Sequence, residues 1–310
     1  MNTLTEINTA ALNNPEQLIT QAEQEYHRTV LETARQILNR KGCKIVLMAG
    51  PSGSGKTTTA HILCDALAAN GVKAAVVSLD NFYLLPNKMP LNQKGEPDFE
   101  TVYALDIPLI QQCFSQIMQS GKTVIPIFNF QKKCREPQGL SIDVSGNKIL
   151  IVEGLHALNP ALTGSLPPGG LFKIYISVNK AVYSGQSVLL SSRQLRLCRR
   201  LSRDYIYRSS SAAFTLKLWS GVVEGEKKYL YCFKNRADAL LSTFHAFEPC
   251  LFAGIVPQLL QELPQKTENY SYALRTKNAL EQFQVLPQAL VPQSSLLREF
   301  IKGGMYEDVT

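Results

Sequence analysis

Hydrophobic positions recur along the chain in two patterns, and each pattern predicts one kind of element. Between residues 14 and 40 they return every three or four positions, which predicts a long helix that begins with Asn14 and Pro15. Unbroken apolar runs predict buried strands, and helical patterns follow the first two of them. The expected strands are residues 44–49, 74–79, 148–154 and 171–178, and the expected helices after them are 58–67 and 108–120. This order predicts an α/β fold, with a mostly parallel sheet flanked by helices.

The same patterns suggest how the chain is divided. Residues 1–15 are polar, and we expect a disordered N-terminus there. Residues 16–263 form the predicted α/β domain, with an arginine-rich lid helix around residues 190–212. Residues 212–263 look helical, with aromatic packing. Residues 264–310 are expected to be a helical C-terminal extension with a tail, beginning with a helical hairpin up to residue 292.

Composition narrows the class of protein. With 310 residues and 45% hydrophobic content, the chain is long enough for one large core. The net charge of +7 is spread out, except for one arginine cluster, so a small polyanionic substrate explains it as well as a nucleic acid does. Seven single cysteines favour a reducing compartment over a disulfide framework or a zinc site. No secretion signal and no membrane segment is visible, so we expect a cytoplasmic protein.

The stretch GPSGSGKT, residues 50–57, matches the pattern G-x-x-x-x-G-K-[ST] between a predicted strand and a predicted helix. Glycines let the backbone N–H groups surround phosphate oxygens, and the start of the helix adds the positive end of its dipole. A chance glycine loop would lack this context. We therefore expect Lys56 to reach the β- and γ-phosphates of a nucleotide and Thr57 to hold Mg²⁺. The full predicted phosphate-binding set is Gly50, Ser52, Gly53, Ser54, Gly55, Lys56, Thr57 and Thr58.

Two acids stand at the carboxyl ends of predicted strands, where ligands bind in open α/β sheets. Asp80 could accept the proton of an attacking hydroxyl, or it could be a turn or capping residue. Glu153 ends the third strand, where P-loop proteins place a carboxylate near Mg²⁺. We predict Asp80 as the general base and Glu153 as a second metal residue.

Arginines are concentrated in one predicted helix, with Arg196, Arg199, Arg200 and Arg203 at spacings of three and four, followed by Arg208. A lid that clamps phosphates is the favoured interpretation, because guanidinium groups match phosphoryl oxygens. A solvated face that holds carboxylates is the alternative. Two phenylalanines further upstream, Phe128 and Phe130, could stack on a planar ligand or simply form one packed strand face.

Taken together, these motifs resemble the uridine kinase and phosphoribulokinase family over roughly residues 16–304, and most of all its bacterial uridine kinase-like nucleoside kinases. The markers are GPSGSGKTT (50–58), SLDNFY (78–83), DFET (98–101), IPIFNF (125–130), VEGLHALNPALT (152–163), RLCRRLSRDYIYR (196–208), LWSGVVEGEKKY (218–229) and LLREFIKGG (296–304). The resemblance implies that Lys56 and the loop hold ATP, that Thr57 and Glu153 sit at Mg²⁺, and that Asp80 is the base.

By the same resemblance, Glu100 stands where uridine kinases place an aspartate on the ribose hydroxyls. Arg200, Arg203 and Arg208 match lid arginines that contact the transferred phosphate and the sugar. The base-reading segment departs from the family, because Phe128 and Lys133 replace a tyrosine and a histidine, and Asn129 an aspartate. A phenyl ring stacks but cannot hydrogen-bond a base edge. The predicted substrate-binding set is Tyr83, Phe99, Glu100, Phe128, Phe130, Lys133 and Arg200.

These observations predict a P-loop kinase that transfers the γ-phosphoryl of ATP to the 5′-hydroxyl of uridine or cytidine, with Asp80, Lys56, Arg200 and Arg203 as catalytic residues. One alternative is the same machinery acting on a sugar, a sugar phosphate or a small acid. Another is a nucleotide-binding regulatory protein without kinase turnover. Nucleic acid is not an expected partner, since no stacking aromatics lie among the arginines. A homo-oligomer stays open.

Overall fold

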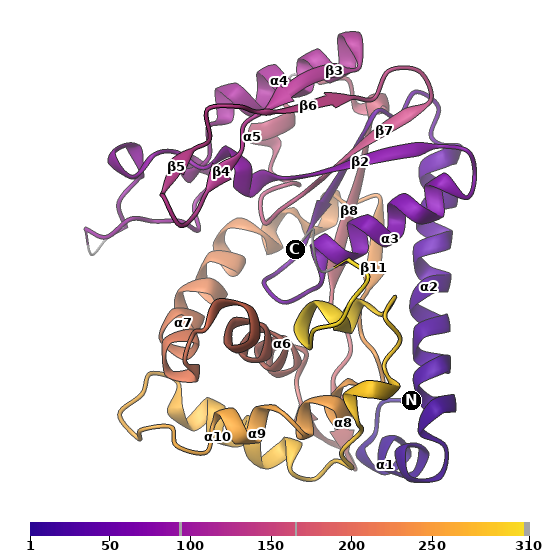
Figure 1. Cartoon of the computed structure of the whole chain (residues 1–310), viewed down its shortest axis with the longest axis vertical. Helices are drawn as coiled ribbons and strands as arrows, with labels where there is room; N and C mark the ends of the chain where they lie inside the picture. The colour runs from indigo at the N-terminus through magenta and orange to yellow at the C-terminus, as the bar shows by residue number, and fades with distance from the viewer. Residues whose placement is uncertain (93–94, 165, 307–310) are drawn as a thin grey trace.

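The computed structural model describes residues 1–92, 95–164 and 166–306 (Figure 1). Within these residues, a five-stranded parallel sheet forms the centre of the molecule, in the order β11-β8-β1-β7-β2. The predicted α/β fold with a mostly parallel sheet flanked by helices is therefore confirmed. The strands are β1 (Ile45–Ala49), β2 (Lys73–Ser78), β7 (Lys148–Glu153), β8 (Leu171–Ser177) and β11 (Ala239–Ser242).

The sheet separates two hydrophobic cores. Strand β1 is buried over its whole length, and its alternate residues go to opposite faces. Val46 and Met48 join the core beneath helices α2 (Pro15–Asn39) and α3 (Lys56–Ala68). Ile45 and Leu47 join the other core, beneath helix α4 (Ile107–Ser120). Burial on both faces explains why the strand reads as an unbroken apolar run.

Local capping explains where the helices begin. The side chain of Asn14 accepts a hydrogen bond from the backbone N–H of Gln17, and Pro15 opens α2, as predicted. In the same way Asp106 accepts from the N–H of Leu109 at the start of α4, which ends at Gly121 in the left-handed conformation. The predicted helices at 14–40, 58–67 and 108–120 are therefore confirmed within a few residues.

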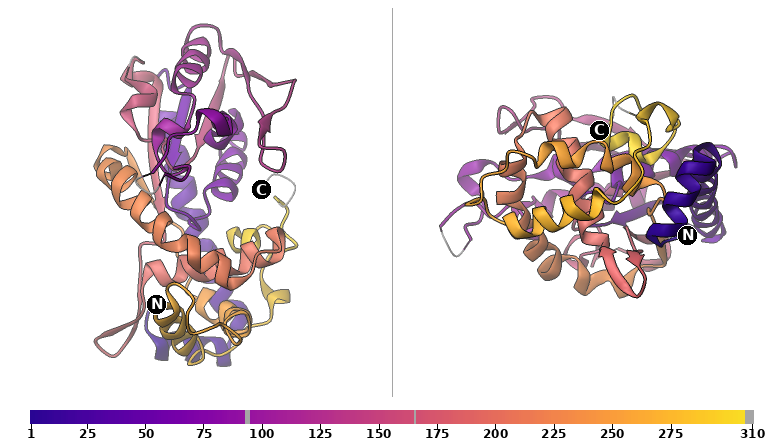
Figure 2. Two further views of the ribbon diagram at one scale, coloured as in Figure 1. Left: turned by 90° about the vertical axis from the view of Figure 1, so that its left-hand side faces the viewer. Right: turned by 90° about the horizontal axis from the view of Figure 1, so that it is seen from below.

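The expectation of a disordered N-terminus is wrong. Residues Leu4–Asn13 form helix α1, which lies against α2 (Figure 2). Thr3 and Glu6 close a capping box, which satisfies the first free N–H groups of the helix. Ile7 and Ala11 then lie on one face at a spacing of four and are buried. Two apolar residues were too weak a signal by themselves, but a neighbouring helix gives them a surface to pack against.

The C-terminal half contains helices α6 (Ser192–Arg208), α7 (Ala212–Tyr229), α8 (Glu248–Ala253), α9 (Val256–Leu259) and α10 (Tyr270–Leu280). Two expectations fail here. Residues 212–263 are not helical throughout, because β11 completes the sheet beside β8. Residues 264–292 hold the single helix α10 rather than a hairpin. A four-residue apolar strand between helices cannot be told from a helical segment by periodicity.

The remaining elements are short. Three two-stranded sheets lie outside the central sheet, formed by β3 (Lys122–Ile125) with β6 (Leu140–Asp143), β4 (Phe128–Asn129) with β5 (Cys134–Arg135), and β9 (Val182–Ser184) with β10 (Ser187–Leu190). Helix α5 (Pro160–Thr163) and seven 3₁₀ segments connect the described elements: η1 (Leu79–Phe82), η2 (Pro86–Lys88), η3 (Val102–Ala104), η4 (Pro168–Gly170), η5 (Tyr231–Arg236), η6 (Gln288–Leu290) and η7 (Leu296–Phe300). None of the helices in the described ranges is long and apolar enough to cross a membrane.

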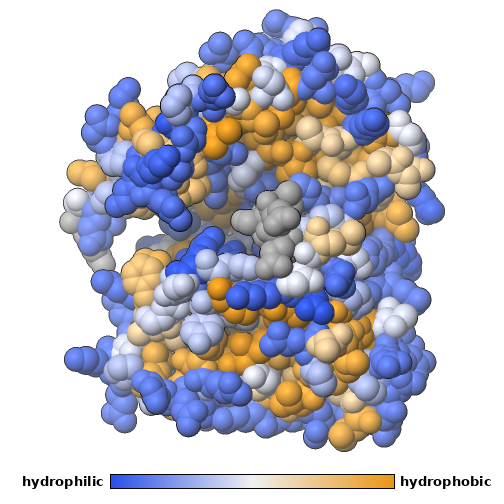
Figure 3. All heavy atoms as spheres, in the orientation of Figure 1, coloured by the Kyte–Doolittle hydropathy of each residue, from blue (hydrophilic) through white to orange (hydrophobic). Residues whose placement is uncertain are grey.

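The C-terminal segment belongs to the main body of the protein. Ala273 of α10 and Leu296 and Phe300 of η7 are fully buried in the same core as α2 and α3. The predicted extension at 264–310 therefore packs on the sheet domain as far as residue 306, while residues 307–310 of the predicted tail lie outside the described residues. Figure 3 shows that the surface is hollowed between the part formed by β4 and β5 and the part formed by α7.

Candidate active site

Three strand ends bring the predicted chemistry together. Strand β1 leads into the glycine loop, β2 is followed by Asp80, and β7 ends at Glu153. In the sheet register, Glu153 pairs with Met48 on one side and with Ser78 on the other. Parallel strands place their carboxyl ends at one edge, so these three segments adjoin. The topology therefore gathers residues that lie about a hundred positions apart in the chain.

The glycine loop has the shape of a phosphate cradle. Gly53 and Gly55 have φ of 72° and 82°, which only glycine adopts without strain. A Cβ atom on Gly53 would lie 2.8 Å from the carbonyl oxygen of Arg196, and one on Gly55 would lie 2.6 Å from Cδ1 of Leu296. The hydroxyl of Ser54 is buried and has no hydrogen-bond partner among the described residues. Lys56 Nζ makes one long contact of 3.5 Å, to the carbonyl of Pro51. An unpaired hydroxyl and a weakly held ammonium fit the phosphates of ATP.

Two arginines of α6 donate hydrogen bonds to backbone carbonyls of this loop. Arg196 donates to the carbonyl of Ser52 at 2.9 Å and to both carboxylate oxygens of Glu226, at 2.7 and 2.9 Å. Glu226 in turn accepts from the backbone N–H of Ser52 at 2.9 Å. Arg199 bonds Glu248 at 2.7 Å and reaches the carbonyl of Gly53 at 3.3 Å.

These contacts correct the expected phosphate-clamping role for Arg196 and Arg199. Both side chains are buried, and so are their two carboxylate partners. The alternative, a solvated face that holds carboxylates, is right for them about the carboxylates and wrong about the solvent. Glu226 and Glu248 were not among the predicted residues, although buried arginines require carboxylates and both acids follow the arginine helix in sequence.

The other three of the five predicted lid arginines share a single carboxylate. Arg200, Arg203 and Arg208 contact Asp204 at 3.2, 3.1 and 3.3 Å. Burial and the neighbouring guanidinium of Arg203 both lower the pKa of Arg208. Arg200 also donates to the hydroxyl of Ser52 at 3.0 Å, which places it at the glycine loop. Three cations on one anion leave positive charge available for a phosphate.

Asp80 lies at the centre of this charge. Its side chain is open to solvent, although protein lies close around the carboxylate. Burial raises its pKa, while Lys56, Arg208 and Arg203 oppose the rise. These cations help keep the carboxylate ionised. Asp80 is thus electrostatically close to Lys56, as the predicted general base has to be.

Glu153 is the second carboxylate of the site. It is buried, and this burial raises its pKa to about 7, with Lys56 opposing the rise and Asp80 adding to it. Thr57 and Glu153 offer only oxygen donors, which suits Mg²⁺. The described residues hold no cluster of three His, Cys, Asp or Glu side chains that could bind a metal alone. The remaining ligands of a Mg²⁺ ion would then be phosphate oxygens and water, as is usual at nucleotide sites.

Four of the predicted substrate residues form an aromatic cluster near Asp80. Tyr83 has ring-centroid distances of 6.1, 6.1 and 6.0 Å to Phe99, Phe128 and Phe130, and the last two rings are 5.1 Å apart. Phe128 is buried within this aromatic cluster, whereas Phe99 and Phe130 are 54% and 58% exposed. Lys133 stands exposed in the turn between β4 and β5. Exposed rings near Asp80 offer a surface on which a planar molecule can stack.

Glu100 lies close to helix α7. A Cβ atom on Gly225 would come within 2.7 Å of Cβ of Glu100, so only glycine permits this approach. Burial raises the pKa of Glu100 to about 7, Arg200 opposes the rise, and Glu226, Asp98 and Asp80 add to it. Glu100 therefore interacts electrostatically with Arg200 and Glu226, which both contact the glycine loop.

Comparison with known proteins identifies the family. Residues 45–246 match the family described as "Phosphoribulokinase / Uridine kinase family". The chain belongs to this family. A uridine kinase of Saccharomyces cerevisiae is 28% identical over 200 residues, which are 64% of this chain and 36% of that protein. A uridine kinase of Ureaplasma urealyticum is 23% identical over 186 residues, covering 60% of this chain and 81% of that protein.

The chain matches about a third of the length of the two yeast relatives, from Saccharomyces cerevisiae and Schizosaccharomyces pombe, 36% in each case. Among solved structures, "Structure of a Possible Uridine Kinase from Bacillus stearothermophilus" is similar, with 16% identity and a TM-score of 0.49. It covers 70% of this chain and 100% of that chain.

The kinase-family match ends at residue 246, but the C-terminal segment beyond it reaches the glycine loop. Glu299 accepts a hydrogen bond from the hydroxyl of Thr58 at 2.8 Å, and Leu296 lies against Gly55. The guanidinium of Arg199 lies 5.3 Å from the ring centre of Phe300. Sequence reasoning assigned no site role to this segment, and nothing in its spacing indicated one.

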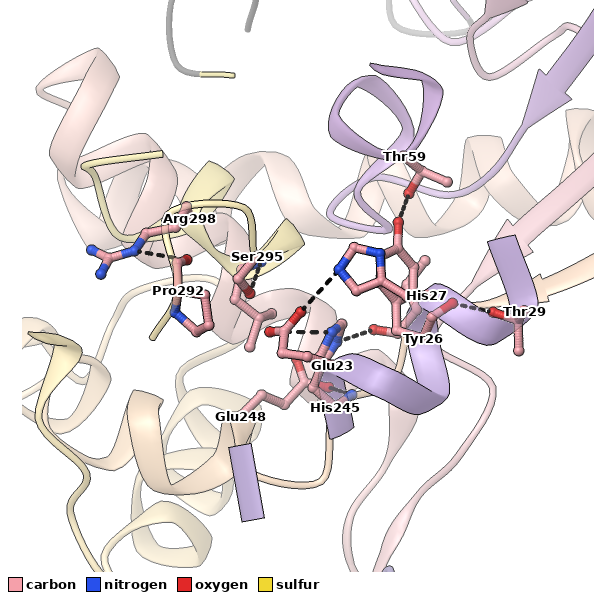
Figure 4. A network of polar contacts seen from close by, with 12 residues as sticks. Glu23, Tyr26, His27, Thr29, Thr59, His245, Glu248, Pro292, Ser295 and Arg298 are labelled. Carbon is pink, nitrogen blue, oxygen red and sulfur yellow. Dashed lines mark hydrogen bonds and ion pairs between the residues drawn. The ribbon is translucent and has the colours of Figure 1, made fainter. Parts of the chain in front are cut away.

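A buried polar network also supports the loop from behind (Figure 4). Tyr26 of α2 donates to the hydroxyl of Thr59 at 2.9 Å, and Thr59 donates to the carbonyl of Gly55 at 2.6 Å. The ring of Tyr26 lies 5.1 Å from that of His245, whose Nε2 is 3.7 Å from a carboxylate oxygen of Glu23. The long N-terminal helix thus contributes hydrogen bonds to the kinase-family loop as well as apolar packing.

Proposed function

We propose that this family member is an ATP- and Mg²⁺-dependent kinase that phosphorylates the 5′-hydroxyl of a pyrimidine nucleoside, uridine or cytidine. One observation carries the proposal. Asp80 is close enough to Lys56, and to Tyr83 of an aromatic cluster with exposed rings, to interact electrostatically with both. A general base at this position adjoins both the phosphate donor and a surface for a planar acceptor.

The proposed reaction is an in-line transfer. The carboxylate of Asp80 takes the proton of the acceptor hydroxyl, whose oxygen forms a bond to the γ-phosphorus as the bond to the oxygen of ADP breaks. Lys56 and the backbone of the glycine loop hold the β- and γ-phosphates. Arg200, Arg203 and Arg208 neutralise the charge that spreads over the transferred group. Mg²⁺, held through Thr57 and Glu153, would supply charge neutralisation between the phosphates.

Charge in the acceptor region favours a neutral acceptor. Asp98, Glu100 and Asp80 carry carboxyl groups there, and Glu226 is close enough to raise the pKa of Glu100. Arg200 opposes the carboxylates around Glu100, and it is already shared with Asp204 and Ser52. A sugar phosphate or a small acid would meet these carboxylates at a cost, whereas a nucleoside brings no charge. This supports the nucleoside over the anionic alternatives.

The decisive experiment measures ADP formation with Mg²⁺ and ATP across nucleosides, sugars, sugar phosphates and small acids. We expect turnover with uridine or cytidine, and a loss of about a thousandfold in kcat in the variant Asp80→Asn. Asp143→Asn is the matched control, because Asp143 lies exposed on the outlying sheet of β3 and β6.

Turnover only with a non-nucleoside acceptor would keep the mechanism and overturn the substrate. Tight ATP binding without turnover on any acceptor would overturn the kinase proposal in favour of a regulatory nucleotide-binding protein. Equal activity of Asp80→Asn and Asp143→Asn would refute the role of Asp80 as the base.

A further inference from the structure

His156 is a buried histidine outside the predicted site residues. It follows β7, three positions after Glu153, and is only 4% exposed. Neither ring nitrogen has a hydrogen-bond partner among residues 1–92, 95–164 and 166–306. Burial lowers the pKa of the ring, while the backbone of Glu100 lies close enough to raise it. Buried polar groups in native proteins nearly always have partners, so two unpaired nitrogens on one side chain need an explanation.

The surroundings of His156 belong to the acceptor region. Its ring lies edge-on to Tyr229 at 5.9 Å, near the end of α7. One turn earlier on the same helix, Gly225 makes the close approach to Glu100. Asp98 is a further charged neighbour of the ring. Two segments, one around Glu100 and one around His156, therefore meet at the same stretch of α7.

The chemistry of the ring restricts its partner. Burial lowers the pKa of His156 to about 4, so the imidazole is neutral near pH 7, with one nitrogen donating and the other accepting. A hydroxyl group complements such a ring, because it also both donates and accepts. A phosphate cannot donate to the accepting nitrogen when fully ionised, and it would meet the carboxylates of Asp98 and Glu100. The reacting hydroxyl belongs at Asp80, so the partner of His156 is a different hydroxyl of the same acceptor.

We propose that His156 is a specificity-determining residue that hydrogen-bonds a non-reacting hydroxyl of the acceptor, which in a nucleoside is the 2′- or 3′-hydroxyl of ribose. This inference rests on the proposed function and deepens it. It implies that the enzyme selects ribose over deoxyribose at a position outside the base-reading segment. Glu100 and His156 would then form the polar end of the acceptor pocket, and the aromatic cluster would form the apolar end.

The test combines substrate analogues with substitutions. We would measure kcat/KM for uridine, 2′-deoxyuridine and 3′-deoxyuridine in the wild-type enzyme, in His156→Phe and in His156→Gln. Phenylalanine keeps a ring against Tyr229 but cannot hydrogen-bond, whereas glutamine keeps a donor and an acceptor. His27→Phe, on the partly exposed side of α2, is the matched control. Thermal unfolding of each variant separates a folding defect from a loss of recognition.

We expect the wild type to prefer uridine over one of the two deoxynucleosides by roughly tenfold to a hundredfold. His156→Phe should lose a similar factor with uridine and almost nothing with that deoxynucleoside, so that the preference disappears. His156→Gln should recover part of it, and His27→Phe should behave as the wild type does. A merely structural role would lower all three substrates alike, and that result would overturn the inference.

Failure of the proposed function gives a different result. If the wild type phosphorylates no nucleoside but uses another hydroxyl compound, the nucleoside proposal fails, and the same comparison with deoxy analogues of that compound decides the role of His156. If no acceptor is phosphorylated and none binds in calorimetry, both proposals are overturned.

Discussion

The buried pair of Arg196 and Glu226 is the most direct test of how this fold holds its glycine loop. The two side chains are 4% and 0% exposed and share two hydrogen bonds, while each also bonds the backbone of Ser52. Glu226→Gln keeps the size of the side chain and an oxygen to accept from Ser52, but it leaves the guanidinium without its counter-charge. Removing one partner of a buried ion pair costs about 3–5 kcal/mol.

The size of the chain converts this cost into a measurable shift. Unfolding entropy scales with length, so about 3–5 kcal/mol corresponds to a fall in Tm of about 5–8 °C for 310 residues. Because Ser52 opens the phosphate cradle, we also expect weaker ATP binding, by about tenfold. Calorimetric unfolding and ATP titration of the purified variant measure the two effects separately.

A double substitution shows whether the charge is the cause. Arg196→Met combined with Glu226→Leu removes both charges and keeps apolar volume, so its stability should exceed that of Glu226→Gln. Arg28→Met with Glu25→Leu, an exposed pair on α2, is the matched control and should change the free energy of unfolding by less than about 1 kcal/mol. A Tm for Glu226→Gln within about 1 °C of the wild type would refute the reasoning.

Three further predictions follow from the site. The pKa of Glu153 is raised in the folded state, so folding takes up a proton and the free energy of unfolding should fall as pH rises from about 4.5 to 7. In urea unfolding without Mg²⁺ or nucleotide, Glu153→Gln should lack this part of the pH dependence. The same pH dependence in the variant and the wild type would contradict the assignment. Phe130→Ala should raise KM for the nucleoside about twofold to tenfold and leave KM for ATP unchanged, whereas an effect on ATP alone would contradict the placement of the ring. Gly55→Ala should abolish ATP binding in calorimetry, because the added Cβ meets Leu296 at 2.6 Å and the backbone at Gly55 is left-handed. Gly71 is also left-handed but lies in open space, so the control variant Gly71→Ala should still bind ATP.

The sequence by itself determined the sheet strands that are buried on both faces and the loop between β1 and α3. Their signals are local: an unbroken apolar run, a capping Asn14, and glycines at fixed spacing before Lys56. The positions of Asp80 and Glu153 at strand ends were predicted for the same reason, since a strand end is visible in sequence and its place at the sheet edge follows from topology. The order of motifs also led to the kinase family, which the match over residues 45–246 confirms.

Only the tertiary structure decided which charges face one another. Arg196 and Arg200 lie on the same helix, yet one is neutralised by Glu226 while the other shares Asp204 and reaches Ser52. The spacing of arginines could not distinguish them, because their partners lie on α7, in the glycine loop or elsewhere on α6. Burial decided the rest: it removed water from His156 and left its nitrogens unpaired, and it covered Ile7 of the N-terminal helix. Burial depends on long-range packing, which the local order of residues does not reveal.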